Sequence, residues 1–366
     1  MYPKRVLQVV AIMNNGGAEN MIMNYYRAID RNKIQFDFLV HYSDKGFFDD
    51  EIRSLGGSIY CAIPIRPWTY YNYLKFLDDF FSFHNDYIAV HAHIQEQCGI
   101  VLKYAAKYGI KICISNSHIA SHSIDLKYPF RILGKYFTCK YTTDRLACGR
   151  DAGRFLYNNE NFVVLKNAIK VENFVFNAVK RNQLRKAWGL SDDLLVVGHI
   201  GRFNPQKNHS FLIDIFKEIH IKKTNSILVL IGDGYLRNSI VQKVKRLGLI
   251  RDVKFLGIVS NVCDILQCFD VLLFPSLYEG LPVSIIEAQA SGLQCVLSDS
   301  IDRETDVTGN CSFLSLKQSP SEWADLTLNV ANRAREDTSE EIQKAGYDVT
   351  KNISWLTELY LKNINI

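Results

Sequence analysis

The segment DVLLFPSLYEGLPVSIIEAQASG, residues 270–292, contains a strand-like run, a Gly-Leu-Pro turn and a helical stretch in that order. The run DVLLFPS is almost continuously apolar, which is typical of a strand buried on both faces of a parallel sheet. Two glutamates, Glu279 and Glu287, lie eight positions apart around the turn. The segment therefore predicts a parallel α/β sheet with carboxylates placed directly after one of its strands.

The rest of the chain repeats this strand–helix order in two series. The strand-like runs of the first series are RVLQVVAIM (5–13), IQFDFLVHYS (34–43), SIYCAIPI (58–65), YIAVHAHI (87–94), KICISNSHI (111–119), RLACG (145–149) and FVVLKNAI (162–169). Those of the second series are LLVVGHIGRF (194–203), SILVLIGDG (226–234), DVKFLGIV (252–259), DVLLFPS (270–276), LQCVLSD (293–299) and CSFLSL (311–316). Alternating strands and helices predict parallel sheets with helices on both faces.

We therefore expect two doubly wound, Rossmann-like α/β domains that face each other across a cleft. The boundary is expected in the polar stretch 171–193, which gives an N-terminal domain of residues 1–178 and a C-terminal domain of residues 179–349. A length of 366 residues, 48% hydrophobic and 22% charged, suits two globular domains.

Composition also limits the class of protein. No apolar run reaches the roughly 18 residues that a membrane-spanning helix needs. The nine cysteines form no CxxC pair, which favours reduced cytosolic thiols over a zinc site. Residues 1–178 carry 21 Lys and Arg against 16 Asp and Glu, so the whole net charge of +5 lies in the first half. This asymmetry is consistent with an anionic partner there.

Ligands of open α/β sheets bind at the carboxyl ends of the strands, so the loops after the strands are the candidates for function. The first is Asn15-Gly16-Gly17-Ala18-Glu19, which opens a helix. Paired glycines let the backbone approach a ligand closely, and free N–H groups at a helix start favour an anion. An ordinary tight turn explains the same residues equally well.

The second loop, Gly201–His209, places Arg202 and Lys207 on either side of a proline turn, before a helix that Asn208 could cap. A guanidinium and an ammonium group there can neutralise a diphosphate, although solvated surface charge is the alternative. The third loop, Gly232-Asp233-Gly234, lacks the third glycine of a dinucleotide fingerprint, which argues against an NAD site.

The fourth loop contains the two glutamates. Pro282 suits the first turn of a helix, and the N–H groups of Leu281, Val283 and Ser284 are then expected to point at a ligand. Carboxylates are good acceptors for sugar diols, so the two glutamates could hold hydroxyls of a transferred sugar and of a ribose. Each glutamate alone also fits a surface or helix-dipole residue, but the pair favours a nucleotide-sugar site.

Together these motifs resemble the retaining, nucleotide-sugar-dependent glycosyltransferases of the GT-B fold (family four). The resemblance covers nearly the whole chain and is strongest over residues 198–315. The Glu-x7-Glu pair in FPSLYEGLPVSIIEAQASG is highly specific to this group. GRFNPQKN resembles the family's diphosphate loop, NNGGAEN its glycine-rich loop, and VKFLGIVSNV the segment that holds the base.

The resemblance implies a role for each matching residue. Glu279 contacts the donor sugar, Glu287 holds the ribose, and His118 lies beside the donor sugar. The implied donor-binding residues are Gly16, Gly17, Gly201, Arg202, Lys207, Gly257, Ile258, Glu279, Gly280, Leu281, Val283 and Glu287. The implied catalytic residues are Glu279, His118, Arg202 and Lys207. The family's terminal helix crosses back to the first domain, so Trp355 and Leu356, within about 350–366, are expected to pack there.

The histidines of the first half have a simpler interpretation as well. His118 could be a satisfied buried histidine, and His91 and His93 are interpreted as structural. The pairs His91/His93 and His118/His122 lack a carboxylate that would complete a zinc site.

The expected chemistry needs no metal. Arg202, Lys207 and oriented amides can stabilise the charge of a diphosphate leaving group, and no DxD motif follows a strand. We expect no divalent cation and no other cofactor. The resemblance implies same-face attack assisted by the departing phosphate, with a hexose or N-acetylhexosamine as the transferred group. UDP is favoured over GDP because it is the commoner donor nucleotide in the family.

Residues 127–145 suggest where the acceptor comes from, because they hold five basic residues and one acid. Lys127, Arg131 and Lys135 recur every four residues and share one face of a helix. The segment suits a helix on an anionic membrane surface, although a core-facing helix with a solvated basic face fits equally well. The membrane interpretation makes the acceptor a lipid-linked saccharide of capsule or exopolysaccharide assembly. The protein would then be cytoplasmic and would touch the inner face of the cell membrane.

Two other functions remain open at this point. A UDP-sugar 2-epimerase of the same fold would turn over without an acceptor, and a catalytically silent sugar-nucleotide-binding protein would bind without transfer. The glutamate pair argues against the former and the intact motifs argue against the latter. The mild charge excess comes with no nucleic-acid-binding motif, so we expect no nucleic-acid partner.

Overall fold

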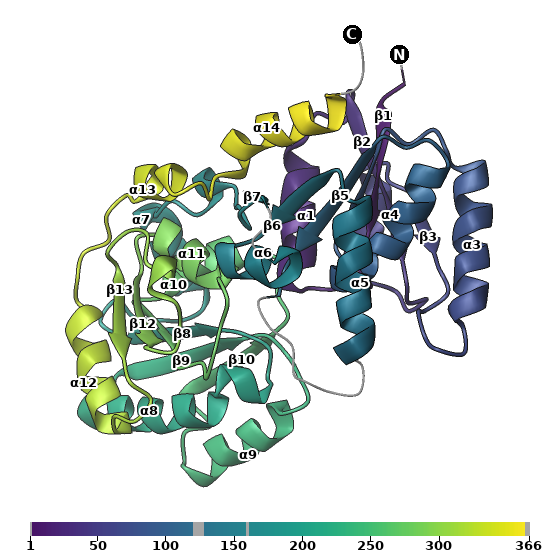
Figure 1. Cartoon of the computed structure of the whole chain (residues 1–366). Coiled ribbons are helices and arrows are strands. Elements are labelled where there is room, and N and C mark those ends of the chain that lie inside the picture. Colours follow the sequence, from purple (N-terminus) through teal and green to yellow (C-terminus); the bar gives the residue numbers. More distant parts are fainter. Residues whose placement is uncertain (1, 120–127, 159–160, 363–366) are drawn as a thin grey trace. The chain divides into compact units, whose positions relative to one another are not determined.

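The computed structural model describes residues 2–119, 128–158 and 161–362, and it divides the chain into two compact units (Figure 1). Unit 1 comprises Met1–Ile169 and Asp348–Ile366, and unit 2 comprises Lys170–Tyr347. The sequence placed the first boundary at 178/179, which is too late. The connecting segment belongs to unit 2 because Gln267 accepts the N–H of Asn177 at 2.9 Å and donates to the Phe174 carbonyl at 3.2 Å.

Unit 1 is built on a seven-stranded parallel sheet of order β3-β2-β1-β4-β5-β6-β7. Its strands are β1 (Lys4–Val9), β2 (Ile34–Val40), β3 (Ile59–Cys61), β4 (Ala89–Ala92), β5 (Ile112–Ser117), β6 (Asp144–Ala147) and β7 (Val163–Val164). Its helices are α1 (Gly17–Ala28), α2 (Asp49–Ser54), α3 (Tyr70–Phe83), the short 3₁₀ helix η1 (Gln95–Gln97), α4 (Cys98–Lys107), α5 (Tyr128–Tyr141), α6 (Arg150–Tyr157) and α14 (Val349–Leu361).

Alternating side chains of β1 divide the core of unit 1 between the two faces of the sheet. Val6 packs with residues of α1, α2 and α14, whereas Leu7 and Val9 pack with residues of α3 and α4. The helix α14 returns from the far end of the chain and packs against α1 (Figure 1). Leu356 and Tyr360 of α14 are buried, but Trp355 is 38% exposed, so the expectation that Trp355 packs inward is wrong.

Unit 2 is built on a six-stranded parallel sheet of order β10-β9-β8-β11-β12-β13. Its strands are β8 (Leu195–Ile200), β9 (Ser226–Ile231), β10 (Val253–Gly257), β11 (Val271–Phe274), β12 (Gln294–Ser298) and β13 (Cys311–Leu314). Its helices are η2 (Val171–Asn173), α7 (Ala178–Ala187), η3 (Pro205–Lys207), α8 (His209–Lys222), α9 (Arg237–Arg246), α10 (Val262–Cys268), α11 (Val283–Ala290), η4 (Arg303–Thr305), α12 (Pro320–Val330) and α13 (Ser339–Lys344).

Both sheets reverse their strand order at one point, as doubly wound sheets do. In unit 1 the reversal lies between β1 and β4, and in unit 2 it lies between β8 and β11. The loops after these strand pairs diverge at the carboxyl edge, where such folds bind ligands. The prediction of two doubly wound α/β domains is confirmed, and it places the loops after β1, β4, β8 and β11 at the candidate sites.

Candidate active site

The loops after β8 and β11 meet at the switch point of unit 2, and an ion pair joins them. Nζ of Lys207 donates to Oε1 of Glu279 at 2.7 Å, with the two side chains only 15% and 7% exposed. The Lys207 ammonium also lies 4.5 Å from the centre of the Phe274 ring. Burial lowers the pKa of Lys207, with Glu279 opposing that effect. Two residues that the sequence assigned to different parts of a donor therefore contact each other.

Gln206 holds the other side of the same carboxylate, and the sequence did not single it out. Its Nε2 donates to Oε2 of Glu279 at 3.2 Å and to the Tyr278 carbonyl at 3.1 Å. The Leu277 N–H donates to the Gln206 carbonyl at 2.8 Å. Gln206 therefore fixes the loop after β11 to the loop after β8. Its place beside Lys207 in the motif was visible, but neither periodicity nor charge marked it.

Glycines let these loops come close to one another. A Cβ at Gly201 would lie 3.0 Å from the Lys207 side chain, so Gly201 leaves room for that side chain to pass. Gly232 and Gly234, with φ of +127° and +158°, lie so near the loop after β8 that a Cβ would approach the Gly201 and Phe203 carbonyls to 2.2 and 2.5 Å. This packing accounts for the Gly-x-Gly pair without a dinucleotide.

Arg202 is exposed, and among the described residues its guanidinium has no hydrogen-bond or ion-pair partner. It is thus available to an anionic ligand at this edge. Asn204 caps η3, because its Oδ1 accepts the Lys207 N–H at 3.2 Å. Asn208, the expected cap of the next helix, instead takes a left-handed conformation with φ of 53° and makes no side-chain cap.

The N-terminus of α11 faces the same loops. Pro282 is the residue before the helix, with φ of −72° and ψ of 115°, so the helix starts one residue later than predicted. In the part of the chain that the structure describes, the N–H groups of Leu281, Val283 and Ser284 donate to no protein acceptor. A Cβ built at Gly280 would meet nothing within 4 Å, so the approach to these N–H groups is open.

Glu287 lies in α11, half-buried and without a hydrogen-bond or ion-pair partner among the described residues. Burial raises the pKa of its carboxyl group to about 7. A desolvated carboxyl group without a donor is costly unless a ligand supplies one. At the end of β10, Gly257 has φ of +69° and Ile258 is 53% exposed, which leaves an apolar surface there.

The glycine loop of unit 1 opens α1 after β1. Gly16 is the residue before the helix, and a Cβ there would lie 2.4 Å from Oε2 of Glu19, the flexible end of a side chain that can move aside. Gly17 begins the helix, and a Cβ there would meet nothing within 4 Å. Backbone packing within unit 1 therefore requires a glycine at neither position.

His118 follows β5 and is half-buried. Its Nε2 lies 2.9 Å from Nδ1 of His93, and burial lowers its pKa to about 4, so the imidazole is neutral at neutral pH. His91 and His93 are both buried, and their rings stack at 4.2 Å. His122 lies outside the described residues.

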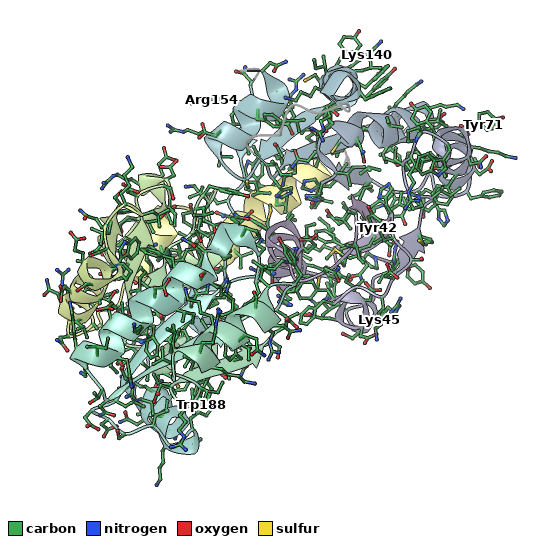
Figure 2. All side chains as sticks on the ribbon, turned by 90° about the horizontal axis from the view of Figure 1, so that it is seen from below. Tyr42, Lys45, Tyr71, Lys140, Arg154 and Trp188 are labelled. Carbon is green, nitrogen blue, oxygen red and sulfur yellow. The ribbon has the colours of Figure 1, made fainter. Side chains whose placement is uncertain are left out.

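The helix α5 turns a different face outward from the one the sequence predicted. Nε of Arg131 lies 3.4 Å from Oε1 of Glu96, and Nζ of Lys135 donates to the Phe155 carbonyl at 2.6 Å. Both basic side chains therefore face neighbouring elements, whereas Lys140 is exposed near the helix end (Figure 2). The exposed apolar side chains are Phe130, Ile132, Leu133 and Tyr136, at 75%, 53%, 54% and 60%. The expected basic outer face is wrong for Arg131 and Lys135, and Lys127 lies outside the described residues.

The helices of the described residues and their possible metal ligands bear on membrane insertion and on metal binding. None of the helices there is both long and apolar enough to span a bilayer. No group of three or more His, Cys, Asp and Glu side chains within residues 2–119, 128–158 and 161–362 is placed to hold a metal ion.

Two doubly wound sheets, with a Lys–Glu pair and an open helix N-terminus at one switch point, define the GT-B class of fold and site. Comparison with known proteins agrees. The family model "Glycosyl transferases group 1" matches residues 195–333. EpsF of Bacillus subtilis (strain 168), a protein assigned to the glycosyltransferases, is 36% identical over 98% of this chain and 96% of its own length. This chain therefore belongs to the group 1 glycosyltransferase family.

Other relatives extend the comparison. The capsular polysaccharide biosynthesis glycosyltransferase CapH of Staphylococcus aureus is 24% identical over 98% of both chains. The UDP-Gal:alpha-D-GlcNAc-diphosphoundecaprenol alpha-1,3-galactosyltransferase of Escherichia coli is 29% identical over 58% of both chains. HepE of Anabaena, solved in complex with UDP and glucose, shares the fold with a TM-score of 0.72 at 16% identity, covering 96% of this chain and 94% of its own.

Proposed function

We propose that this chain is a retaining glycosyltransferase that moves a hexose or N-acetylhexosamine from a UDP-sugar to a lipid-diphosphate-linked saccharide during capsule or exopolysaccharide synthesis. The observation that carries the proposal is the group of complementary side chains after β8 and β11. There Arg202, which has no partner among the described residues, and a Lys207–Glu279 pair lie beside an open helix N-terminus. The Escherichia coli relative, whose name specifies UDP-Gal and a diphosphoundecaprenol acceptor, supports the donor and acceptor classes.

The diphosphate of the donor would lie at the carboxyl edge of the sheet of unit 2, where Arg202 and Lys207 supply positive charge. Arg202 can contact it as a fork, and the N–H groups of Leu281, Val283 and Ser284 can donate to its oxygens. Glu287 would accept the two ribose hydroxyls, which would supply donors that its half-buried carboxyl group does not find among the described residues. Gly257 and Ile258 would support the base, the latter through its exposed apolar side chain.

Glu279 would bind the donor sugar while Lys207 and Gln206 hold it in place. Each carboxylate oxygen has two acceptor positions, so one donor on each oxygen still leaves room for a sugar hydroxyl. The Lys207 ammonium uses one of its three N–H groups for Glu279 and can offer the others to the diphosphate. In unit 1, we assign Gly16 and Gly17 to the phosphates and His118 to the sugar.

The proposed step breaks the bond between the anomeric carbon and the diphosphate oxygen. An acceptor hydroxyl oxygen forms the new bond on the same face, and its proton passes to the departing diphosphate. Arg202, Lys207 and the amide groups of α11 stabilise the charge that develops on that leaving group. Because cationic side chains supply this stabilisation, we propose that transfer needs no divalent metal.

We also propose that unit 1 touches the cytoplasmic membrane surface through α5, where a lipid-linked acceptor is found. The supporting feature is the apolar set Phe130, Ile132, Leu133 and Tyr136 on its outer face. Contact through such side chains depends on apolar burial rather than on charge.

The test is a panel of UDP- and GDP-sugars incubated in EDTA or in Mg²⁺, with and without a lipid-diphosphate sugar, scoring released nucleotide and extended lipid. Wild type is compared with Glu279→Ala, with Glu287→Gln and with Asp264→Asn, a surface control in unit 2. We expect one UDP-sugar to be consumed equally in EDTA and Mg²⁺, with acceptor raising the release and Glu279→Ala abolishing it.

The other outcomes identify the rival functions. Conversion of the donor without acceptor would indicate an epimerase, and UDP binding with no turnover of any donor would indicate a silent binder. NMR of the product linkage decides retention, since an inverted anomeric configuration would contradict the proposed same-face step.

A further inference from the structure

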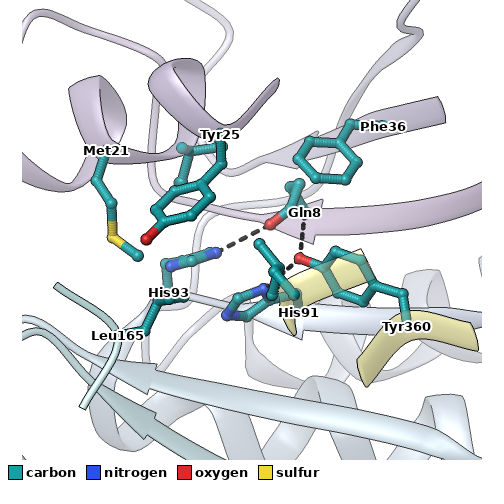
Figure 3. A pocket seen from close by; sticks show the side chains of 10 residues that line it. Gln8, Met21, Tyr25, Phe36, His91, His93, Leu165 and Tyr360 are labelled. Atoms are coloured by element: carbon teal, nitrogen blue, oxygen red, sulfur yellow. Dashed lines mark hydrogen bonds between the residues drawn. The ribbon is translucent and has the colours of Figure 1, made fainter. Parts of the chain in front are cut away.

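A continuous chain of hydrogen bonds runs through the interior of unit 1, and Figure 3 shows its part from His93 through Gln8 and Tyr360 to His91. His118 Nε2 lies 2.9 Å from His93 Nδ1, and His93 Nε2 lies 3.0 Å from Gln8 Oε1. Gln8 Nε2 donates to the Tyr360 hydroxyl at 3.2 Å, and that hydroxyl lies 2.8 Å from His91 Nδ1. Gln8, His91, His93 and Tyr360 are buried and line a cavity of about 10 Å³.

The fold brings these residues together from distant parts of the sequence. Gln8 and His91 are register partners on the neighbouring strands β1 and β4, and His93 lies two residues further on the same face. His118 follows β5, which pairs with β4. Tyr360 comes from α14, 352 residues after Gln8. The chain of hydrogen bonds thus links the C-terminal helix to the loop that carries His118.

The direction of each bond follows from the Gln8 amide. Its oxygen can only accept, so His93 must carry its proton on Nε2. Burial lowers the pKa of His93 far below its usual value, so the ring is neutral and Nδ1 has a lone pair. His118 Nε2 must then donate to that lone pair. Because His118 is also neutral, its own Nδ1 carries a lone pair rather than a proton.

We infer that Gln8 and His93 are positioning residues that set the tautomer of His118, and that Tyr360, with His91 as its acceptor, holds the Gln8 amide in the orientation this requires. The inference rests on the proposed function in one respect, namely that His118 meets the donor sugar. The tautomer decides whether His118 donates a hydrogen bond to the sugar or accepts one from it. With Nδ1 as an acceptor, His118 receives a hydrogen bond from a sugar hydroxyl.

A reversed Gln8 amide would reverse the protons along the whole chain. Gln8 would donate to His93 Nε2, His93 Nδ1 would donate to His118, and His118 would carry its proton on Nδ1. The same imidazole would then offer the sugar a donor in place of an acceptor. A hydroxyl can donate as well as accept, so Tyr360 opposes this reversal only while it accepts the Gln8 N–H and gives its own proton to His91 Nδ1. That arrangement needs the His91 proton on Nε2, so the His91 tautomer is part of the same prediction.

The test reads the tautomers directly, by long-range ¹H–¹⁵N NMR of histidine-labelled protein at neutral pH. In wild type we expect the proton on Nε2 for both His93 and His118. Tyr360→Phe and Gln8→Met should shift the His118 tautomer ratio by about 2- to 10-fold, the range that one hydrogen bond of typical net strength allows. Gln8→Glu, which keeps an acceptor for His93, should restore the wild-type tautomer.

Tyr25→Phe is the matched control, since Tyr25 lines the same cavity but its hydroxyl donates to the Lys166 carbonyl outside the chain of hydrogen bonds. It should leave the His118 spectrum unchanged. A wild-type His118 with its proton on Nδ1 would overturn the inference, and so would an unchanged spectrum in both Tyr360→Phe and Gln8→Met. The wild-type spectrum alone tests the direction even where a variant folds poorly.

Activity separates this inference from the proposed function. If transfer occurs, Tyr360→Phe should lower kcat with little change in the KM for the acceptor, and Tyr25→Phe should not. If no donor is turned over while the tautomers behave as expected, the proposed function fails and the role of Gln8, His93 and Tyr360 stands.

Discussion

The Lys207–Glu279 pair is largely buried, and this determines what removal of either partner does. Glu279→Gln leaves an ammonium group in a desolvated site, which typically costs about 3 kcal/mol or more of unfolding free energy. Adding Lys207→Met removes the stranded charge, so the double variant should recover most of the stability while remaining inactive. Urea denaturation of the two variants and of wild type measures both effects.

An exposed ion pair in the same unit provides the control. Lys180 and Asp264 are 42% and 27% exposed, so Asp264→Asn should change the unfolding free energy by less than about 1 kcal/mol. Equal, small losses for Glu279→Gln and Asp264→Asn would show that the Lys207 site is well solvated.

Glu287 predicts an unusual dependence of stability on pH. Its pKa in the folded protein is raised from 4.5 to about 7, so folding favours the protonated carboxyl group. Its stabilising effect is therefore complete below about pH 4.5 and is lost as the pH rises through about 7. Glu287→Gln should raise the unfolding free energy at pH 8 by up to about 3 kcal/mol and change it little at pH 4.5.

The same variant should bind the donor less well, because an amide accepts fewer ribose hydroxyls than a carboxylate. Chemical denaturation at several pH values, together with titration of UDP, measures the two effects on one protein. A Glu287→Gln variant that is less stable than wild type at pH 8 would contradict the placement of Glu287 in a desolvated site.

For single residues, the sequence predicted which residues lie at the site better than it predicted which of them contact each other. Arg202, Lys207, Glu279 and Glu287 could be placed at strand ends because each follows an apolar run or opens a helix. That Lys207 faces Glu279 depends on the order of β8 and β11 in the sheet, which one sequence does not reveal. Gln206 was missed for the same reason.

Among the elements, α5 allows the clearest experiment. Its outer face is apolar, so vesicle binding should persist at high salt and should fall about ten-fold or more in Phe130→Ser/Tyr136→Ser, through loss of apolar burial. Sedimentation with anionic and with zwitterionic vesicles measures the binding. Tyr235→Ser, which alters a 76% exposed tyrosine of unit 2, is the control and should bind as wild type does. Release by salt alone would show that charge dominates instead.

Periodicity predicted that Arg131 and Lys135 share a face, and they do both turn inward. It could not show which way that face points, because a Lys135 ammonium over the Phe155 ring and an Arg131–Glu96 pair arise only from tertiary packing. An amphipathic pattern with aromatic residues on one side and Arg or Lys on the other therefore does not predict which side of α5 faces outward.

For the whole molecule, the separate cores of the two units predict separate responses to mutation. Leu356 of α14 is buried in the core of unit 1, so Leu356→Ala should cost unit 1 about 2–5 kcal/mol. Hydrogen exchange in mild denaturant should show lost protection in β1 and β4 and unchanged protection in β12. Leu230→Ala, in the core of unit 2, should give the reverse pattern. Loss of protection everywhere in both variants would mean that the units unfold as one.

The sequence predicted the architecture of the two sheets better than any other feature of the molecule. Thirteen apolar runs separated by helical stretches correspond to the seven and six strands of the two sheets. The boundary was misplaced because residues 171–193 were interpreted as one connecting stretch, although hydrogen bonds from Gln267 to Phe174 and Asn177 attach its start to unit 2.

The chain leaves unit 1 at Ile169 and returns beside it, where the Val349 N–H donates to the Ile169 carbonyl at 2.9 Å. Unit 2 is thus an insertion between the sheet of unit 1 and the helix that completes its core. On the ribosome, the 178 residues of Lys170–Tyr347 must be synthesised before α14 exists, which takes about 10–40 s at ordinary elongation rates. During that interval the nascent first domain lacks Leu356 and Tyr360 and leaves apolar surface on α1 uncovered, which makes it a natural client for chaperones.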